Sequence, residues 1–121
     1  MWDEYLTEGT LLGGVYTYRT KNGLHLYQFD YIQENSYWIV QIISQESYEE
    51  LDASFTTTHR IQDKLGRVFI KFKEPERVNT LPKAQTLSIF WAEATTSYIL
   101  TGKTIDKQIT NQQTNNENQS N

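Results

Sequence analysis

Residues that commonly perform chemistry are sparse in this chain of 121 residues. It contains no cysteine, which excludes disulfides, thiol catalysis, iron–sulfur clusters and cysteine-bound zinc. Its two histidines, His25 and His59, lie far apart, and neither has the second histidine four residues away that a helical metal site uses. The sequence therefore predicts no metal ion and no cofactor.

Catalytic motifs are also missing from the sequence. No serine stands in a Gly-x-Ser-x-Gly or Ser-x-x-Lys motif, and there is no glycine-rich phosphate loop. The acidic cluster Glu49, Glu50 and Asp52 falls where we expect an exposed loop, and exposed carboxylates seldom act as acids or bases. We therefore expect no catalytic residue and a protein that is not an enzyme. A small enzyme that pairs His59 with a carboxylate of this loop is a further hypothesis, and it requires a closed pocket.

Composition and charge narrow the class of protein. Hydrophobic residues make up 37% of the chain and aromatic residues 13%, which suits one domain with a real core. No apolar run approaches the roughly 18 residues of a membrane helix, and the acidic N-terminus is unlike a secretory signal. Eleven Lys and Arg against fifteen Asp and Glu give a net charge of −4, which disfavours a general attraction to nucleic acid. We expect a soluble cytoplasmic protein of bacterial or phage origin.

The elements that position the side chains begin with residues 14–44, which we expect to form three antiparallel strands. Asn22-Gly23 predicts a two-residue type I′ turn, and Glu34-Asn35 predicts a second turn that sets Tyr31 opposite Trp38. Both registers place the same alternate apolar side chains on one face. That face consists of Tyr16, Tyr18, Tyr27, Phe29, Tyr31, Trp38, Val40 and Ile42.

A second hairpin and a helix complete the predicted domain. Its strands are expected near Ser54–Ile61 and Arg67–Lys73. A helix from about Leu81 to Thr101 follows, with Thr80 as its N-cap and Gly102 as its C-cap. The fold class is α+β: a five-stranded antiparallel β-meander packed against one C-terminal α-helix. We expect a single domain over residues 1–103 and a disordered, Asn-, Gln- and Thr-rich tail over residues 104–121.

The helix is expected to bury one stripe against the aromatic face. The buried stripe is predicted to contain Ala84, Leu87, Phe90, Trp91, Ala94 and Tyr98. The outward side is predicted to contain Thr86, Ile89, Glu93 and Thr96. With the aromatic face covered, the opposite face of the first three strands carries more large aliphatic side chains than a solvent face usually does, and is the first candidate for a contact surface.

The leading hypothesis is a small protein-binding module, such as an adaptor, an inhibitor or an immunity-like factor. Its partner is another protein, and formation of a homodimer is left open. The residues predicted to bind the partner lie on the face opposite the aromatic one: Arg19, Leu26, Gln28, Asp30, Tyr37, Ile39 and Gln41. Arginine and tyrosine often anchor interfaces, so Arg19 and Tyr37 lead this set.

The alternative is a module that binds single-stranded nucleic acid. Seven of the eleven basic residues fall between Arg60 and Lys83. Arg67, Lys71 and Lys73 would contact phosphates or another anion, and nearby aromatic rings would stack on bases. The net charge of −4 disfavours this alternative.

Overall fold

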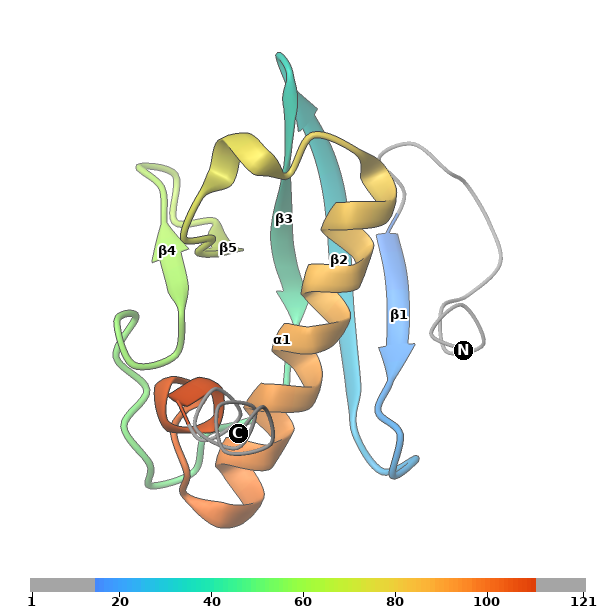
Figure 1. The fold of residues 1–121 in the computed structure, drawn as a ribbon. Coiled ribbons are helices and arrows are strands. Elements are labelled where there is room, and N and C mark those ends of the chain that lie inside the picture. Colours follow the sequence, from blue (N-terminus) through green and yellow to red (C-terminus); the bar gives the residue numbers. More distant parts are fainter. Residues whose placement is uncertain (1–14, 111–121) are drawn as a thin grey trace, which may run out of the picture.

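The structure, a computed structural model, describes residues 15–110. These residues form a five-stranded antiparallel sheet with one long helix across one of its faces (Figure 1). The elements are β1 Val15–Arg19, β2 Leu26–Glu34, β3 Tyr37–Ser44, β4 Arg60–Gln62, β5 Val68–Ile70, the 3₁₀ helix η2 Pro75–Arg77 and α1 Leu81–Thr101. The predicted α+β class is confirmed.

The first hairpin has the predicted register but a different turn. Tyr18 faces Tyr27 across β1 and β2, as the sequence predicts. The N–H of Thr20 donates to the carbonyl of His25 at 2.9 Å, so residues 21–24 form a longer loop than a two-residue turn. Within that loop only Gly23 has a positive φ, of 77°, whereas a type I′ turn needs two such residues. The type I′ prediction is therefore wrong.

The second hairpin turns one residue later than predicted. Glu34 pairs with Tyr37, so Asn35 and Ser36 form the loop, and Asn35 takes the positive φ of 52° that asparagine tolerates. Tyr31 therefore faces Val40 rather than Trp38. This pairing differs from the expected one by two residues, and strand side chains alternate with a period of two, so every side chain keeps its predicted face.

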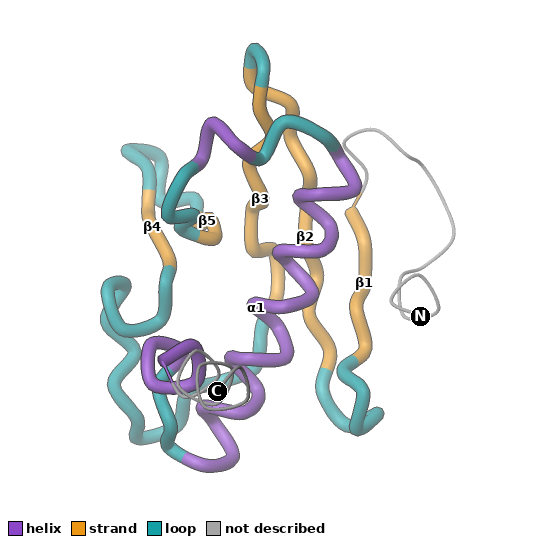
Figure 2. The backbone as a smooth tube through the Cα atoms, in the orientation of Figure 1, coloured by secondary structure: helices purple, strands orange, loops and turns teal. Residues whose placement is uncertain are grey.

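The β4–β5 hairpin is shorter than predicted, and its strand order is not that of a meander. Residues 54–59 form turns instead of strand, because the N–H of Thr58 donates back to the carbonyl of Ser54 at 3.0 Å. The strand order is β1-β2-β3-β5-β4, so β3 pairs with β5 and the long loop before β4 passes to the edge of the sheet (Figure 2).

Helix α1 has the predicted ends. The hydroxyl of Thr80 accepts a hydrogen bond from the N–H of Lys83 at 3.3 Å. Gly102 closes the helix with a φ of 78°, and its N–H donates to the carbonyl of Tyr98 at 2.7 Å. Both caps therefore satisfy backbone groups that the helix leaves unpaired.

The buried face of α1 differs from the predicted stripe. Ile89 and Thr96, predicted to face outward, are buried, whereas Leu87 and Phe90 are 37% and 42% exposed. Thr96 is buried because its Oγ1 lies 2.8 Å from the hydroxyl of Tyr27. A stripe read from apolar residues alone misses such polar contacts, which buried tyrosine hydroxyls require.

A helical segment over residues 105–110 packs beside the end of α1 (Figure 2). Ile105 is 3% exposed and belongs to the core, and the side-chain amide of Gln108 donates to the carbonyl of Ala94 at 3.0 Å. The described domain thus extends past the boundary expected at residue 103. The predicted tail beyond residue 110 lies outside the described residues.

Candidate functional site: the outer face of the sheet

The aromatic face of the sheet is filled by the core, as predicted. Tyr18, Tyr27, Phe29 and Tyr31 are fully buried, and the ring of Trp91 meets the rings of Tyr27 and Phe29 edge-on. These rings are therefore not free to stack on nucleic-acid bases, as a module that binds single strands through the aromatic face would require.

The opposite side of the sheet, which we call the outer face, points away from α1. Arg19 and Leu26 are exposed, and the other five residues predicted to bind a partner are half-buried. Strand alternation puts all seven on this face, because their immediate neighbours in the strands belong to the buried set. The structure therefore places the predicted residues Arg19, Leu26, Gln28, Asp30, Tyr37, Ile39 and Gln41 on one surface.

Strand pairing arranges this surface into a polar centre with an aliphatic border. Asp30 faces Gln41 across β2 and β3, and Ile32 faces Ile39 in the same pair. On the other border Leu26 is 46% exposed at the end of β2, opposite Arg19. The large aliphatic side chains on this open face favour a contact surface over a solvated sheet face. Their arrangement is the reverse of most interfaces, where the centre is apolar and the rim polar.

The outer face continues onto the β4–β5 hairpin, which was not predicted from the sequence. Gln41 faces Phe69 on β5, and Phe69 faces Ile61 on β4. Phe69 is 8% exposed under the guanidinium of Arg67, which lies 5.4 Å from the ring centre, whereas Ile61 is 51% exposed. The signal in the sequence is Phe69 itself, an aromatic residue that alternates with Arg67 and Lys71 on the strand expected at Arg67–Lys73.

A shallow cavity of about 380 Å³ lies where β3 meets this hairpin. Its lining includes Tyr37, Ile39, Ile61, Phe69 and Pro75. Two of the predicted partner-binding residues, Tyr37 and Ile39, therefore form one wall of the cavity. A concave apolar site beside a flat sheet is suited to receive an anchoring side chain of a partner.

Asp30 at the polar centre has an unmet hydrogen-bonding requirement. Its Oδ1 atom is buried and has no hydrogen-bond partner among the described residues. Burial raises the pKa of Asp30 above its ordinary value of 3.8, against a backbone hydrogen bond from Tyr31 that lowers it. Asp30 therefore places a half-buried carboxylate at the centre of the outer face, and one of its oxygens is unsatisfied within residues 15–110.

The remaining predicted residues are used in different ways. Arg19 donates from Nη1 to the carbonyl of Gly23 at 3.2 Å, so it supports its own hairpin loop. Arg67 donates from Nε to Asp63 at 2.7 Å. Lys71 and Lys73 are exposed beyond the end of β5, and Lys73 lines a groove beside α1 instead of the outer face. The three basic residues of the nucleic-acid hypothesis are therefore not one continuous patch.

The histidines and carboxylates are placed separately as well. His59 lies 2.8 Å from Asp106 of the 105–110 segment, not beside a carboxylate of the 49–52 loop. Asp52 accepts hydrogen bonds from the N–H of Ser54 and the hydroxyl of Thr57, which hold its pKa below the ordinary value. Within residues 15–110 no three His, Cys, Asp or Glu side chains come together in a way that would hold a metal ion.

The fold and this surface define an α+β protein with one helix-covered and one open sheet face. No helix among the described residues is long and apolar enough to cross a membrane. No family model matches the chain, and comparisons with curated proteins and with solved structures find no similar protein. The function must therefore be argued from the surfaces of this molecule alone.

Proposed function

We propose that this protein is a small cytoplasmic binding module, of the adaptor, inhibitor or immunity type, that docks a partner protein on its outer face. The observation that carries the proposal is the composition of that face: aliphatic side chains and an apolar cavity surround an aspartate whose Oδ1 has no partner within residues 15–110. A partner that covers the face would bury the aliphatic border, and its donor would satisfy Asp30.

The chemistry of the partner follows from this arrangement. It should present an N–H donor, most favourably a lysine or arginine, to Asp30, because hydrogen bonds to a charged group are the stronger ones. It should also carry an apolar side chain that enters the cavity beside Tyr37 and Ile39. The partner could also be a second copy of the chain, in which case the purified protein alone would form a dimer in solution.

The test compares two apolar-to-acidic substitutions. Ile39→Asp places a charge at the cavity wall, whereas Leu65→Asp places the same charge on a turn where the side chain is 80% exposed. Wild-type protein and both variants are used as bait in lysate of the source cells, each captured protein is identified, and its affinity is measured with purified components. We expect Ile39→Asp to weaken binding at least ten-fold, which is about 1.4 kcal/mol, and Leu65→Asp to leave it unchanged.

Two controls make the result decisive. Thermal unfolding of Ile39→Asp should remain cooperative; if the variant unfolds, Leu26→Asp tests the same face at a side chain that is 46% exposed. A purified partner that binds Ile39→Asp and Leu26→Asp as tightly as wild type contradicts the proposal. So does a monomeric wild-type protein that captures nothing.

A further inference from the structure

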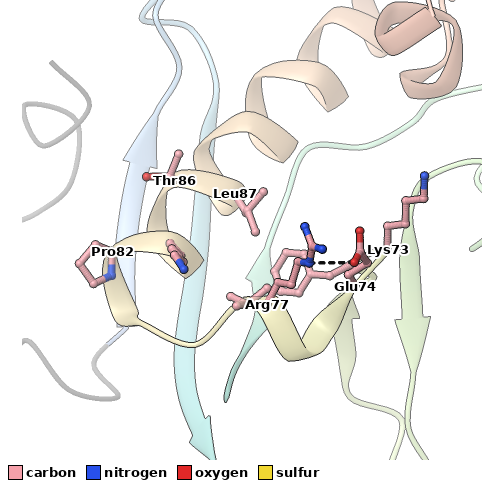
Figure 3. Close-up of a pocket in the computed structure, with 9 residues that line it drawn as sticks. Lys73, Glu74, Arg77, Pro82, Thr86 and Leu87 are labelled. Atoms are coloured by element: carbon pink, nitrogen blue, oxygen red, sulfur yellow. Dashed lines mark ion pairs between the residues drawn. The ribbon is translucent and has the colours of Figure 1, made fainter. Parts of the chain in front are cut away.

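A groove lies on the helix side of the sheet, between α1 and the segment that follows β5. It consists of two adjoining cavities of about 520 and 570 Å³ that share Phe72, Lys73 and Leu87 in their linings. Figure 3 shows the first cavity, where Leu87 and Thr86 of α1 lie across from Lys73, Glu74 and Arg77. The groove has α1 as one of its walls and opens on the helix side of the sheet, and it meets the outer-face cavity at Ile70, Lys71 and Phe72.

The floor of the groove is apolar. Leu87 and Phe90 were predicted to be buried, but they remain 37% and 42% exposed because they point into this space. Phe72 is half-buried between the two cavities, and Trp91 and Ile105 line the second. Partly exposed apolar side chains gathered in a concave site indicate a surface that binds apolar groups.

The rim of the groove is basic on a protein of net negative charge. Lys71, Lys73, Arg77 and Lys83 line the two cavities, against the carboxylates Glu74 and Asp106. Four positive and two negative side chains leave a formal charge of +2 at the groove, whereas the whole chain carries −4.

The lysines of this rim are available to a ligand. Glu74 pairs with Arg77 at 2.9 Å, and Asp106 pairs with His59 at 2.8 Å. No carboxylate among residues 15–110 forms an ion pair with Lys71, Lys73 or Lys83. The ammonium group of Lys83 donates to the side-chain oxygen of Asn79, at 2.9 Å.

We infer that this groove binds an acidic segment of a partner protein that carries large apolar side chains. The apolar side chains would pack on Leu87, Phe90 and Phe72, and the carboxylates would reach the unpaired lysines on the rim. Of the three rings in the floor only Phe90 is exposed, whereas Phe72 is half-buried and Trp91 is buried, so the floor is a poor stacking platform for a nucleic acid. The net charge of −4 opposes a long polyanion more than a short acidic segment.

The ligand is selected without assuming its sequence. A displayed library of random 12-residue peptides is enriched on the wild-type protein and counter-selected on Lys73→Glu. We expect enriched peptides to combine Asp or Glu with Leu, Phe or Trp, and their affinity to fall as salt concentration rises. Failure to enrich any peptide above background, or enrichment of peptides without acidic residues, would overturn the inference.

Matched variants then locate the binding site by fluorescence anisotropy with a labelled enriched peptide. Lys73→Glu and Phe90→Asp should each weaken binding at least ten-fold, and Lys83→Glu provides a second reversal of charge on the same rim. Lys64→Glu, on the turn between β4 and β5, makes the same charge change away from the groove and should alter affinity less than two-fold. Equal effects of Lys64→Glu and Lys73→Glu contradict the assignment.

Two further measurements separate the other occupants of the groove. A labelled 15-nucleotide deoxythymidine strand that binds more tightly than the peptide, and loses binding in Lys73→Glu, would make the groove a nucleic-acid site instead. Sedimentation of the wild-type protein as a dimer that Phe90→Asp dissociates would make the occupant a second copy of the chain. Ile39→Asp should leave peptide binding unchanged, so failure of the outer-face proposal does not affect this inference.

Discussion

The carboxylate of Asp30 should lower the stability of the unbound protein, and the proposed partner would restore that stability on binding. Its Oδ1 is buried, with no donor in the part of the chain that the structure describes, and burial raises the pKa of Asp30 above 3.8, so the folded state disfavours the charged form. Asp30→Asn keeps the shape and removes the charge. We expect this variant to be more stable than wild type at pH 7 by a fraction of a kcal/mol, because partial exposure lets water screen the charge.

Urea unfolding at several pH values tests this expectation. A group whose pKa is raised on folding contributes stability that is present below its unfolded pKa and is lost as the pH rises through the folded pKa. The advantage of Asp30→Asn should therefore be present at pH 7, shrink as the pH falls through the raised folded-state pKa, and be lost below pH 3.8, where Asp30 is protonated in both states. Gln41→Asn, a shortening of the neighbouring amide, is the control and should show no such pH dependence. An Asp30→Asn variant less stable than wild type at pH 7 would refute the argument.

Tyr27 and Tyr31 should make the protein sensitive to alkali. Burial raises the pKa of each from 10.0 to about 12, against side-chain hydrogen bonds with Thr96 and Ser88, respectively, that lower it. The unfolded chain therefore releases protons that the folded chain retains, and stability falls as the pH rises from 10 toward 12. We expect the double variant Tyr27→Phe, Tyr31→Phe to lose less stability over this range in urea titrations.

At pH 7 the single variants should differ according to their hydrogen bonds. The hydroxyl of Tyr31 lies 2.7 Å from Ser88 Oγ, so Tyr31→Phe should cost about 1 kcal/mol. The buried hydroxyl of Tyr16 has no partner among the described residues, so Tyr16→Phe should cost nothing. Equal losses in the two variants would contradict this reading of the core.

At the scale of elements, the sequence predicted which face each strand buries better than it predicted the turns. Alternation from Tyr27 to Tyr31 and from Trp38 to Ile42 is a local property, so it survived a turn placed one residue too early. The conformations of Asn22-Gly23 and Asn35-Ser36 were not predictable in the same way. Several loop lengths satisfy the same strand register and differ only in backbone dihedral angles.

The ends of α1 were predictable because caps depend on neighbouring residues alone, and its rotation was not. The face that α1 buries depends on tyrosine hydroxyls of the sheet, such as the Tyr27 hydroxyl, which forms a hydrogen bond with the hydroxyl of Thr96. A helix pattern read by itself cannot show where those hydroxyls lie. This is why Leu87 and Phe90, predicted as core, became the floor of the groove.

The C-cap of α1 gives a prediction with a purely conformational cause. Gly102 has a φ of 78°, and a Cβ added there would meet no atom within 4 Å. Gly102→Ala should therefore cost about 1 kcal/mol through the backbone conformation alone, measured by chemical unfolding. Gly102→Asn should cost less, because asparagine adopts this conformation more readily. An alanine variant as stable as wild type would show that the helix end rearranges.

At the scale of the whole molecule, strand order decides what the candidate site contains. The seven predicted residues came from one local meander, whereas Phe69 and Ile61 reach the outer face only because β5 pairs with β3. The long connection before β4 carries little local information about that pairing. The cavity beside Ile39 was therefore not predictable from the sequence, although one of its walls was.

The β4–β5 hairpin also gives the molecule two surfaces, the outer face and the groove, which open on opposite sides of the sheet and meet at Lys71 and Phe72. Lys71, exposed just beyond β5, lines the outer-face cavity and the second cavity of the groove. Ile39 lines only the first of these, and Phe90 only the second. Substitutions without shared contacts have additive effects, so Ile39→Asp and Phe90→Asp should each affect one ligand only.

Lys71→Glu should be the exception and weaken both interactions. Its cation borders the acidic segment expected in the groove, and its stem forms part of the outer-face cavity, so charge reversal there acts on either side of β5. The measurement is the affinity of each purified ligand for Lys71→Glu, for Ile39→Asp, for Phe90→Asp and for the double variant of the last two. We expect the double variant to show the sum of the single free-energy changes within about 0.5 kcal/mol. Two results would contradict this arrangement. Weaker peptide binding by Ile39→Asp would show that the surfaces overlap beyond Lys71, and an effect of Lys71→Glu on one interaction alone would show that they do not meet there.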